Sequence, residues 1–393
     1  MALSTVSRIS TIRHVGVRGL STVPPGYNAP MIVPPFFSDD KNWKADHAEV
    51  YAKFQKRFGN APLVAIGTGI IGQGLHEFTR IHNHGFNTGG IDNGLDITSK
   101  RSLRGFLAHV IRTNGLKAGD RLPVFNGAAF LSAHPNIAGS IDVNVGGAIN
   151  LIIVAQEIMK DRGVDITILT PSSIARDQLS SPYGTGKRLV ENLTSFQNLS
   201  TPTDFRSVIL PGLISGLNPL GGSTDTPDAL ARHVAHLVVY EEADGDEKWH
   251  VLKALGMESE DFVSAVRVDR KVSMGGIKDV VSSLMQVFAL DSLPTAIPIC
   301  GGPSMSYSVN DAEHALKNHL GTRYPQFKLI EDLGVQQKNL EEWGPIGIEL
   351  PNVDREHGIC SVAEELDVSV VSAYEHYREL ALATLKKTHN HHH

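Results

Sequence analysis

The chain has 393 residues, of which 41% are hydrophobic and 20% are charged, and its formal net charge is −6 at pH 7. This length predicts two lobes, and the negative charge gives no electrostatic basis for binding nucleic acid or a membrane surface. The two cysteines, Cys300 and Cys360, lack ligand-type spacing, which argues against a disulfide framework or thiolate metal site and indicates a reducing compartment. No uninterrupted apolar run reaches about 18 residues, so we expect no membrane span.

The amino-terminal 38 residues contain no Asp or Glu, and they carry Arg8, Arg13 and Arg18 among many serines and threonines. This composition is typical of a mitochondrial transit peptide, and the alternative is a disordered Ser-rich tail. Prolines between positions 24 and 35 predict an extended linker. We therefore expect a leader and linker over residues 1–38 and a mitochondrial matrix protein, or a cytoplasmic one if the segment is only a tail. The His-rich residues 388–393 indicate a tag or a frayed tail.

A glycine-rich loop follows a short apolar strand predicted at residues 62–66. Gly67 permits a tight turn, Gly69 lets the backbone approach a pyrophosphate, and Gly72 allows close packing of helix on strand. The helix itself is predicted from the spacing of Leu75, Phe78 and Ile81. Its amino terminus would face the phosphates of a dinucleotide.

Asp92 follows the glycines at about the distance at which dinucleotide-binding units place an acidic residue. A carboxylate there would accept hydrogen bonds from the adenosine ribose and repel a 2′-phosphate, which favours NAD over NADP. The alternative is an ordinary turn aspartate at the end of a strand.

Strand and helix patterns then alternate along the chain. We expect a strand end at residues 95–98, helices at 103–111 and 145–159, and strands at 122–125 and 165–169. This order predicts an α/β fold with a Rossmann-type doubly wound parallel sheet, followed by a smaller C-terminal α/β substrate lobe. The boundaries are expected at residues 60–215 for the NAD-binding domain and 216–387 for the substrate lobe. Ala128 and Ala129 would let a cofactor lie against the backbone, or they serve ordinary tight packing.

Tyr183 and Lys187 stand four residues apart and would share one face of a helix. A neighbouring ammonium stabilises a phenolate, so we expect Lys187 to bring the pKa of Tyr183 towards working pH and make it a general base. The alternative is an exposed helix start with a solvated lysine. Hydroxyl groups of the Thr-Pro-Ser-Ser segment at residues 170–173, which follows the strand at residues 165–169, would point into the crevice that binds the cofactor.

Several motifs in order resemble the extended short-chain dehydrogenase/reductases, which belong to the NAD-dependent epimerase/dehydratase superfamily, and most resemble their L-threonine 3-dehydrogenase branch. They comprise Phe-Leu-Ser-Ala at residues 130–133, Val-Asn-Val-Gly-Gly at 143–147, Pro-Ser-Ser-Ile at 171–174, Asp-Phe-Arg-Ser-Val at 204–208, Leu-Pro-Gly-Leu-Ile-Ser at 210–215 and Gly-Gly-Ser-Thr-Asp at 221–225. The similarity extends from about residue 62 to residue 226 and is faint beyond.

The resemblance implies oxidation of L-threonine to 2-amino-3-oxobutanoate with NAD as hydride acceptor, in a homodimer. Tyr183 would be the base, and Lys187 and Ser173, or else Ser172, would assist it. The implied cofactor-binding residues are Gly67, Gly69, Ile70, Ile71, Gly72, Asp92, Asp96, Ile97, Ala128, Ala129, Asn144, Lys187, Pro211 and Leu213. The implied substrate-binding residues are Ser132, Ser173, Tyr183 and Thr224.

The chain departs from the family pattern at several positions. Ile66 replaces the first glycine of the loop, and Arg176 and Asp177 replace an aromatic-Gly pair. Only nine residues separate Ser173 from Tyr183, which leaves open whether the two side chains meet.

Two other functions stay open beside threonine oxidation. One is a nucleotide-sugar epimerase or dehydratase of the same superfamily, and the other is a catalytically silent NAD-binding scaffold. A metal site is not expected, because His76, His82 and His84 lack acidic or cysteine companions at ligand spacing and are interpreted as solvated histidines at a helix end.

Overall fold

The structure of the chain is a computed structural model. It describes residues 47–67, 69–91, 94–129, 137–173, 176, 182–200, 203–210, 212–214, 227–245, 247–248, 250, 267–269, 272–291, 293, 296–299, 306–307, 309–321, 329–331 and 362–390. The leader, the linker and the His-rich tail beyond residue 390 lie outside these residues.

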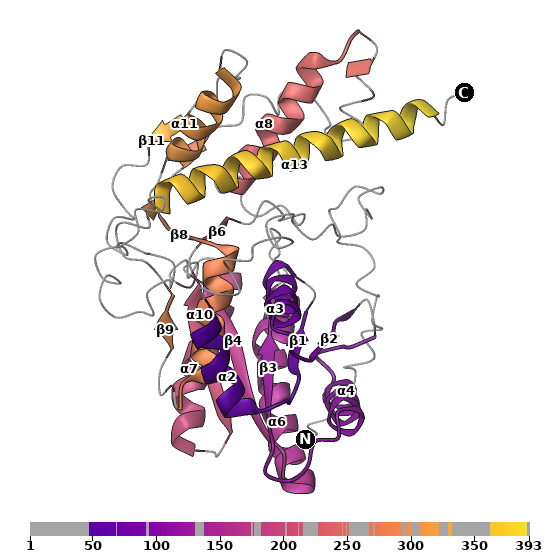
Figure 1. Cartoon of the computed structure of the whole chain (residues 1–393), viewed down its shortest axis with the longest axis vertical. Helices are drawn as coiled ribbons and strands as arrows, with labels where there is room; N and C mark the ends of the chain where they lie inside the picture. The colour runs from indigo at the N-terminus through magenta and orange to yellow at the C-terminus, as the bar shows by residue number, and fades with distance from the viewer. Residues whose placement is uncertain are drawn as a thin grey trace, which may run out of the picture.

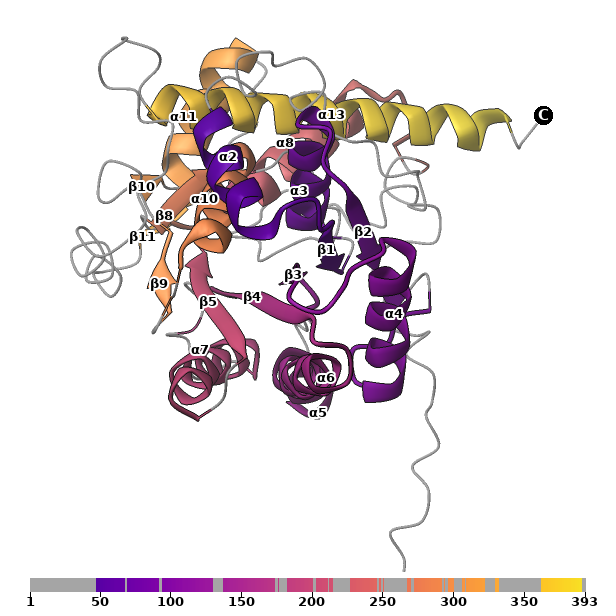
Figure 2. The ribbon, with the colours of Figure 1, turned by 60° about the horizontal axis from the view of Figure 1, so that its bottom comes forward.

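A six-stranded parallel sheet forms the centre of the amino-terminal part (Figures 1 and 2). Its order is β2 (Phe86–Gly89), β1 (Leu63–Ile66), β3 (Arg121–Asn126), β4 (Asp165–Ser173), β5 (Asp204–Leu210) and β9 (Ile297–Pro298). The chain passes from β1 to β2 on one side and then to β3 on the other side of β1. Ligands of open α/β sheets bind where the strand order reverses in this way, so the topology points to the carboxyl ends of β1 and β3.

Helices cover both faces of this sheet, as Figure 2 shows. The first face carries α2 (Ala48–Phe58), α3 (Ile70–Ile81) and α10 (Ile277–Ala289), and the second carries α4 (Lys100–Thr113), α6 (Gly147–Arg162) and α7 (Pro182–Ser200). Successive residues of a strand point to opposite faces. Accordingly, Leu63 and Ala65 lie in the core under α2, α3 and α10, while Val64 and Ile66 lie in the core under α4 and α6. The doubly wound Rossmann-type fold is therefore confirmed.

The helix before β4 is longer than predicted. It comprises α5 (Ile137–Ile141), a π-helical segment η3 (Asp142–Gly146) and α6, and it ends at Gly163, whose φ of 68° is left-handed. By length and hydropathy the stretch Ile137–Arg162 could cross a membrane, but 44% of its apolar 18-residue segment is buried inside the protein. One side of the helix, which includes Leu151 and Val154, packs in the core under the sheet. We interpret it as a core helix.

The strand end predicted at residues 95–98 is wrong. These residues form an irregular turn, because the Asp96 carboxylate accepts hydrogen bonds from the backbone N–H of Thr98 at 2.9 Å and from its hydroxyl at 2.7 Å. Such local side-chain bonds compete with strand pairing. Ser99 then begins α4 by accepting a hydrogen bond from the N–H of Ser102.

The carboxyl-terminal part contains helices and small sheets. Helices α8 (Pro227–Glu242), α11 (Val309–Leu320) and α13 (Val362–Asn390) enclose one apolar cluster, while β6 (Gly212–Ile214), β8 (Val272–Gly276) and β10 (Ser306–Tyr307) form one small sheet, and β7 (Arg267–Asp269) pairs with β11 (Leu329–Glu331). The predicted boundary at residue 215 needs one correction, because α10 packs on α2 and α3 and β9 pairs with β5. These later elements complete the first sheet, and the contiguous segment 216–387 is not a separate unit.

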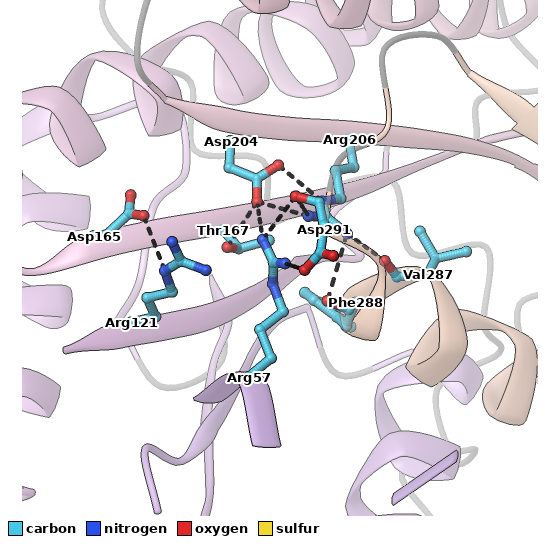
Figure 3. A network of polar contacts seen from close by, with 9 residues as sticks. All are labelled: Arg57, Arg121, Asp165, Thr167, Asp204, Arg206, Val287, Phe288 and Asp291. Atoms are coloured by element: carbon cyan, nitrogen blue, oxygen red, sulfur yellow. Dashed lines mark hydrogen bonds and ion pairs between the residues drawn. The ribbon is translucent and has the colours of Figure 1, made fainter. Parts of the chain in front are cut away.

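A polar cluster around Asp204 and the buried Arg206 holds α2, the sheet and α10 together at the amino end of β5 (Figure 3). The Arg206 side chain is fully buried, and its guanidinium donates two hydrogen bonds to the Asp204 carboxylate, both at 2.8 Å, and others to the carbonyl oxygens of Val287 and Phe288 at the end of α10. Arg57 of α2 donates to the same Asp204 carboxylate at 3.0 Å. These contacts fasten the helices at the end of the sheet opposite the carboxyl edge.

Candidate active site

The glycine turn lies between the carboxyl ends of β1 and β3. Gly67 has a φ of +98°, and its N–H donates to the Gly89 carbonyl at 2.7 Å. A Cβ on Gly67 would lie 2.9 Å from the backbone nitrogen of Ala128, and one on Gly72 would lie 2.8 Å from the carbonyl oxygen of Gly67. Both positions therefore require glycine: the first for conformation and close approach, the second so that α3 can pack on the turn.

Gly69 differs from the other two glycines, because a Cβ at this position would meet nothing within 4 Å. It is the N-cap of α3, and the first turn of the helix contains no acidic side chain. The leading N–H groups of a helix have no intrahelical partners and favour an anion. An open glycine at such a helix start, placed at the switch point of the sheet, fits the pyrophosphate of a dinucleotide.

Three isoleucines flank the glycine turn. The side chains of Ile70 and Ile71 pack against the apolar cluster under α3, so only their backbone groups face the turn. Ile66 is a buried strand residue whose side chain lies in the opposite core. It does not fill the turn, and the three remaining glycines shape the loop without the missing one.

The predicted adenine contacts are only partly available. Ile97 is 7% exposed, and its side chain packs against Gly147 at the start of α6. Asp96 is exposed but shares its carboxylate with Thr98. A hollow of about 530 Å³ lies at this edge of the sheet, away from Tyr183, and its lining comprises Gly94, Leu95, Ser99, Arg101, Ser102, Gly105 and Phe106.

Tyr183 lies in the first turn of α7, where it meets the end of β4. Its phenol lies beside the side chain of Ser173, whose hydroxyl lowers the pKa of the tyrosine, so the short connection does bring the two together. The Lys187 ammonium is buried, donates a hydrogen bond to the Pro171 carbonyl at 2.8 Å, and lies 5.3 Å from the centre of the Tyr183 ring. The alternative of a solvated lysine at an exposed helix start is therefore wrong.

The acid–base properties of this pair differ from the prediction. Burial raises the pKa of Tyr183 to about 12, and the hydrogen bond with Ser173 lowers it by a smaller amount. Burial also lowers the pKa of Lys187 to about 8. The expected lowering of the tyrosine pKa by the lysine is not observed in the protein alone, because desolvation disfavours both charged forms and the ammonium is directed to Pro171.

Asn144 is the polar residue that the π-helical segment presents to α7. It is 3% exposed, its amide donates to the Ser140 hydroxyl at 3.1 Å, and its Cβ would lie 3.4 Å from a Cβ added to Gly186. The π-helical segment and α7 therefore lie in contact three residues from Tyr183. π-Helical turns are frequent at functional sites, and this one brings Asn144 to the edge of the candidate site.

Several predicted residues lie outside the described residues, namely Asp92, Ser132, Pro211 and Thr224. Leu213 is in β6. Ala128 and Ala129 follow Gly127 after the end of β3, and Ala128 lies beside Gly67. The approach to Gly67 is made by the backbone nitrogen of Ala128, while its side chain packs against the core under α4 and α6.

Sequence reasoning missed Glu191, which lies one helical turn beyond Lys187. Its carboxylate is 7% exposed and accepts hydrogen bonds from the hydroxyl of Ser172 and the guanidinium of Arg176. The available signal was the spacing of four residues from Tyr183 to Lys187 and again to Glu191, because this spacing places all three side chains on one helix face.

The interpretation of the histidines near α3 as solvated is wrong for two of the three. His82 stacks on Tyr51 with ring centres 4.3 Å apart, and His84 contacts the Tyr51 hydroxyl at 3.3 Å and the Ala61 carbonyl at 2.9 Å. They join α2 to the sheet and are not solvated, whereas His76 is exposed. Within the described part of the chain, no group of three or more His, Cys, Asp or Glu side chains could hold a metal ion.

Comparison with known proteins shows similarity in structure and not in sequence. No protein-family model matches the chain, and no curated protein matches it in sequence. RMD from Pseudomonas aeruginosa complexed with NADPH is 13% identical, with a TM-score of 0.52 over 81% of this chain and 100% of that one. L-threonine 3-dehydrogenase from Trypanosoma brucei is 16% identical, with a TM-score of 0.51 over 81% and 97%.

A third solved structure, GDP-mannoheptose C4 reductase from Campylobacter jejuni with NADP bound, is 16% identical, with a TM-score of 0.50 over 81% of this chain and 98% of that one. Such a likeness at low identity concerns the fold. The chain therefore has the fold of the extended short-chain dehydrogenase/reductases, as the sequence resemblance predicted.

Proposed function

We propose that this chain is a nicotinamide-dinucleotide-dependent oxidoreductase that interconverts an alcohol and a carbonyl group. The observation that carries the proposal is the juxtaposition of Ser173 and Tyr183 with the buried Lys187, whose ammonium lies 5.3 Å from the centre of the Tyr183 ring, on the same sheet whose switch point holds the open glycine turn. A proton carrier and a dinucleotide cradle on one sheet are what such a reaction needs.

Each of these groups has a distinct task in the proposed reaction. The turn at Gly67, Gly69 and Gly72 would hold the pyrophosphate, and Lys187 would hold the nicotinamide ribose. The bound cofactor supplies hydride acceptance or donation and, when oxidised, a positive charge. Ser173 donates to the reacting oxygen, and Tyr183 moves the proton to or from it.

The protonation state of Tyr183 favours one direction near neutral pH. With its pKa raised to about 12, the phenol is protonated and can donate to a carbonyl oxygen as the carbonyl is reduced. Alcohol oxidation requires the phenolate. At pH 8 the ionised fraction of Tyr183 is only roughly 10⁻⁴ before the charge of a bound cofactor acts on it. The protein alone is thus set for reduction, and oxidation depends more strongly on the oxidised cofactor.

For the substrate we propose L-threonine, oxidised to 2-amino-3-oxobutanoate. The ordered motifs from residue 130 to residue 225 support it, and the Trypanosoma brucei enzyme is among the similar structures. The second candidate is a sugar nucleotide, because a GDP-sugar reductase is similar to the chain to the same degree.

The discriminating experiment follows reduced nicotinamide absorbance in parallel reactions of the full chain. One contains L-threonine with NAD, and others contain GDP-linked keto sugars with NADH or NADPH. Turnover of threonine supports the first candidate and turnover of a keto sugar the second. Cofactor binding without any turnover supports a catalytically silent NAD-binding scaffold.

The cofactor is proposed to be NAD on the basis of Asp92, which would repel a 2′-phosphate. Arg101 lines the hollow beside β2 and is the cation that could offset this preference. Titrating the protein with NADH and NADPH by fluorescence compares the two directly. Tighter binding of NADPH, lost in Arg101→Ala, would assign the cofactor as NADP instead.

We also propose a homodimer formed through α7. Leu189 and Phe196 support this, because they are 39% and 61% exposed on the outer side of that helix. Sedimentation equilibrium of the full chain and of Phe196→Ser tests the proposal: the variant should weaken a dimer, and a monomeric wild type contradicts it.

Location in the mitochondrial matrix is a proposal from residues 1–38. Fusing these residues to a fluorescent protein tests it, with a matched fusion in which Arg8, Arg13 and Arg18 are changed to Ala. Import that depends on the arginines supports a transit peptide, and cytoplasmic fluorescence supports a tail.

A further inference from the structure

Glu191 is a buried carboxylate on the same face of α7 as Tyr183 and Lys187. It is 7% exposed and sits two helical turns after the tyrosine. Charged side chains are almost never this buried unless they are paired. Its partners therefore indicate why the charge is retained so close to the candidate site.

The two carboxylate oxygens of Glu191 bind different parts of the site. One accepts the hydroxyl of Ser172, which is 1% exposed and directly precedes Ser173 at the end of β4. The other accepts a guanidinium N–H of Arg176 at 2.5 Å and lies 3.5 Å from that of Arg188. One side chain thus joins the carboxyl end of β4, Arg176 in the connection after it, and the helix that carries the tyrosine.

We infer that Glu191 is a positioning residue that holds Ser173 in hydrogen-bonding register with Tyr183 by fixing Ser172 and Arg176. The inference rests on the proposed oxidoreductase function for its effect on turnover. Ser172 also lies 3.4 Å from the carbonyl oxygen of Lys187, so its hydroxyl is held between two points of α7. Because Ser173 is the next residue, a strand end fixed at Ser172 restricts where its hydroxyl can lie.

Arg176 explains how the short connection can serve this purpose. The Arg176 side chain is 15% exposed and that of Glu191 is 8% exposed, so the ion pair is largely removed from water. Charge-assisted hydrogen bonds of this kind are short and directional. Arg176 stands only three positions after Ser173, where the pattern of the family that the chain resembles has an aromatic residue. The ion pair anchors the start of the connection on α7.

The first arm of the test needs neither substrate nor cofactor. The protein is labelled with carbon-13 at the tyrosine ring carbon that bears the hydroxyl, and Tyr183→Phe assigns the Tyr183 resonance among the 8 tyrosines. Ser173→Ala gives the resonance position without the hydrogen bond. We expect Glu191→Gln to move the resonance towards that position.

A matched control comes from α11, where Glu313 is 5% exposed and paired with Lys317 at 2.6 Å. Glu313→Gln also removes a buried paired carboxylate and should leave the Tyr183 resonance unchanged. If Glu191→Gln fails to fold, Ser172→Ala is the second variant and should move the resonance in the same direction. An unmoved resonance in the folded variants overturns the inference.

The second arm measures turnover. Because small displacements of catalytic groups cost large factors in rate, we expect Glu191→Gln to lower kcat by about 10- to 100-fold while the cofactor Kd stays within about twofold. The double variant Arg176→Gln/Glu191→Gln, which leaves no unpaired buried charge, should remain slow. Restored turnover in the double variant would overturn the positioning role, because it would assign the pair to charge balance alone. Absence of turnover in the wild type would contradict the proposed function and leave the resonance arm intact.

Discussion

The Lys187 ammonium lies 5.3 Å from the centre of the Tyr183 ring and donates its hydrogen bond to the Pro171 carbonyl, not to the phenol. The contact is a cation–π arrangement over the ring face. Burial acts on both groups at once, raising the pKa of the tyrosine to about 12 and lowering that of the lysine to about 8. The protein alone therefore favours the neutral phenol, and the charge that would activate it has to come with the cofactor.

The direction of the Tyr183 pKa predicts opposite pH dependences for the two reaction directions. Oxidation uses the phenolate, so its kcat/KM for the cofactor, which reports the protonation state of the free enzyme, should rise continuously from pH 7 to pH 10, approaching tenfold per unit. Reduction uses the phenol, which is already protonated, and should not rise over the same range. Rate profiles in both directions check this, and a plateau of the oxidation rate near pH 7 would contradict it.

The lowered pKa of Lys187 predicts that the free energy of unfolding depends on pH. Its folded pKa of about 8 lies below its ordinary value of 10.5, so the unfolded state binds more protons between these pH values and stability rises with pH across this window. Below pH 8 the full penalty is present, about 3 kcal/mol for a shift of this size. Urea denaturation from pH 7 to pH 10.5 should show the gain in the wild type.

The matched comparison for this effect is Lys187→Met against Lys53→Met. The Lys53 side chain is 65% exposed in a surface pair with Glu49, so its removal should leave the pH dependence unchanged. Lys187→Met should lose the rise above pH 8. Parallel stability curves for wild type and Lys187→Met would show that the lysine is not desolvated.

Gly67→Ala should damage the cofactor cradle. The φ of +98° is strained for any L side chain, and the new methyl group would lie 2.9 Å from the backbone at Ala128. We expect NADH binding to weaken by at least about tenfold and the free energy of unfolding to fall by about 1–3 kcal/mol. Fluorescence titration and urea denaturation measure the two effects.

Gly105→Ala is the control for that substitution. Gly105 lies within α4, and a Cβ there would meet nothing within 4 Å. Alanine should stabilise the helix by about 0.5–1 kcal/mol. If both variants lower stability equally, the special geometry of Gly67 is not the cause.

Arg206→Met should be among the most destabilising single changes away from the site. It removes a fully buried guanidinium that bonds Asp204 and the end of α10, and breaking a buried pair in this way costs about 3–5 kcal/mol. Arg121→Met is the comparison, because the Arg121 side chain is 46% exposed and lies 3.6 Å from Asp165. That change should stay within about 1 kcal/mol, and equal losses would contradict the role assigned to Arg206.

Much of the first sheet was predictable from local sequence. The apolar run at residues 62–66, the glycines after it and the spacing of Leu75, Phe78 and Ile81 reflect backbone geometry that neighbouring residues alone determine. The pairing of Tyr183 with Lys187 was predictable for the same reason, since four residues along a helix always share a face.

Features that depend on tertiary contacts were not predictable. The pKa of Tyr183 depends on burial, and the place of α10 and β9 depends on long-range packing that no local pattern encodes. Asp96 was read as part of a strand, although its bonds to Thr98 form a turn instead. Arg176 and Glu191 are fifteen residues apart in sequence, and only the meeting of β4 with α7 reveals them as a pair.

The measurement that tests the account most directly is hydride transfer by wild type and Tyr183→Phe, followed by nicotinamide absorbance with L-threonine or a GDP-linked keto sugar as substrate. The phenylalanine keeps the ring and removes only the proton carrier, so we predict a loss of turnover of about 10²- to 10⁴-fold with unchanged NADH binding. A variant that turns over as fast as the wild type would contradict the assignment of Tyr183 as the group that moves the proton.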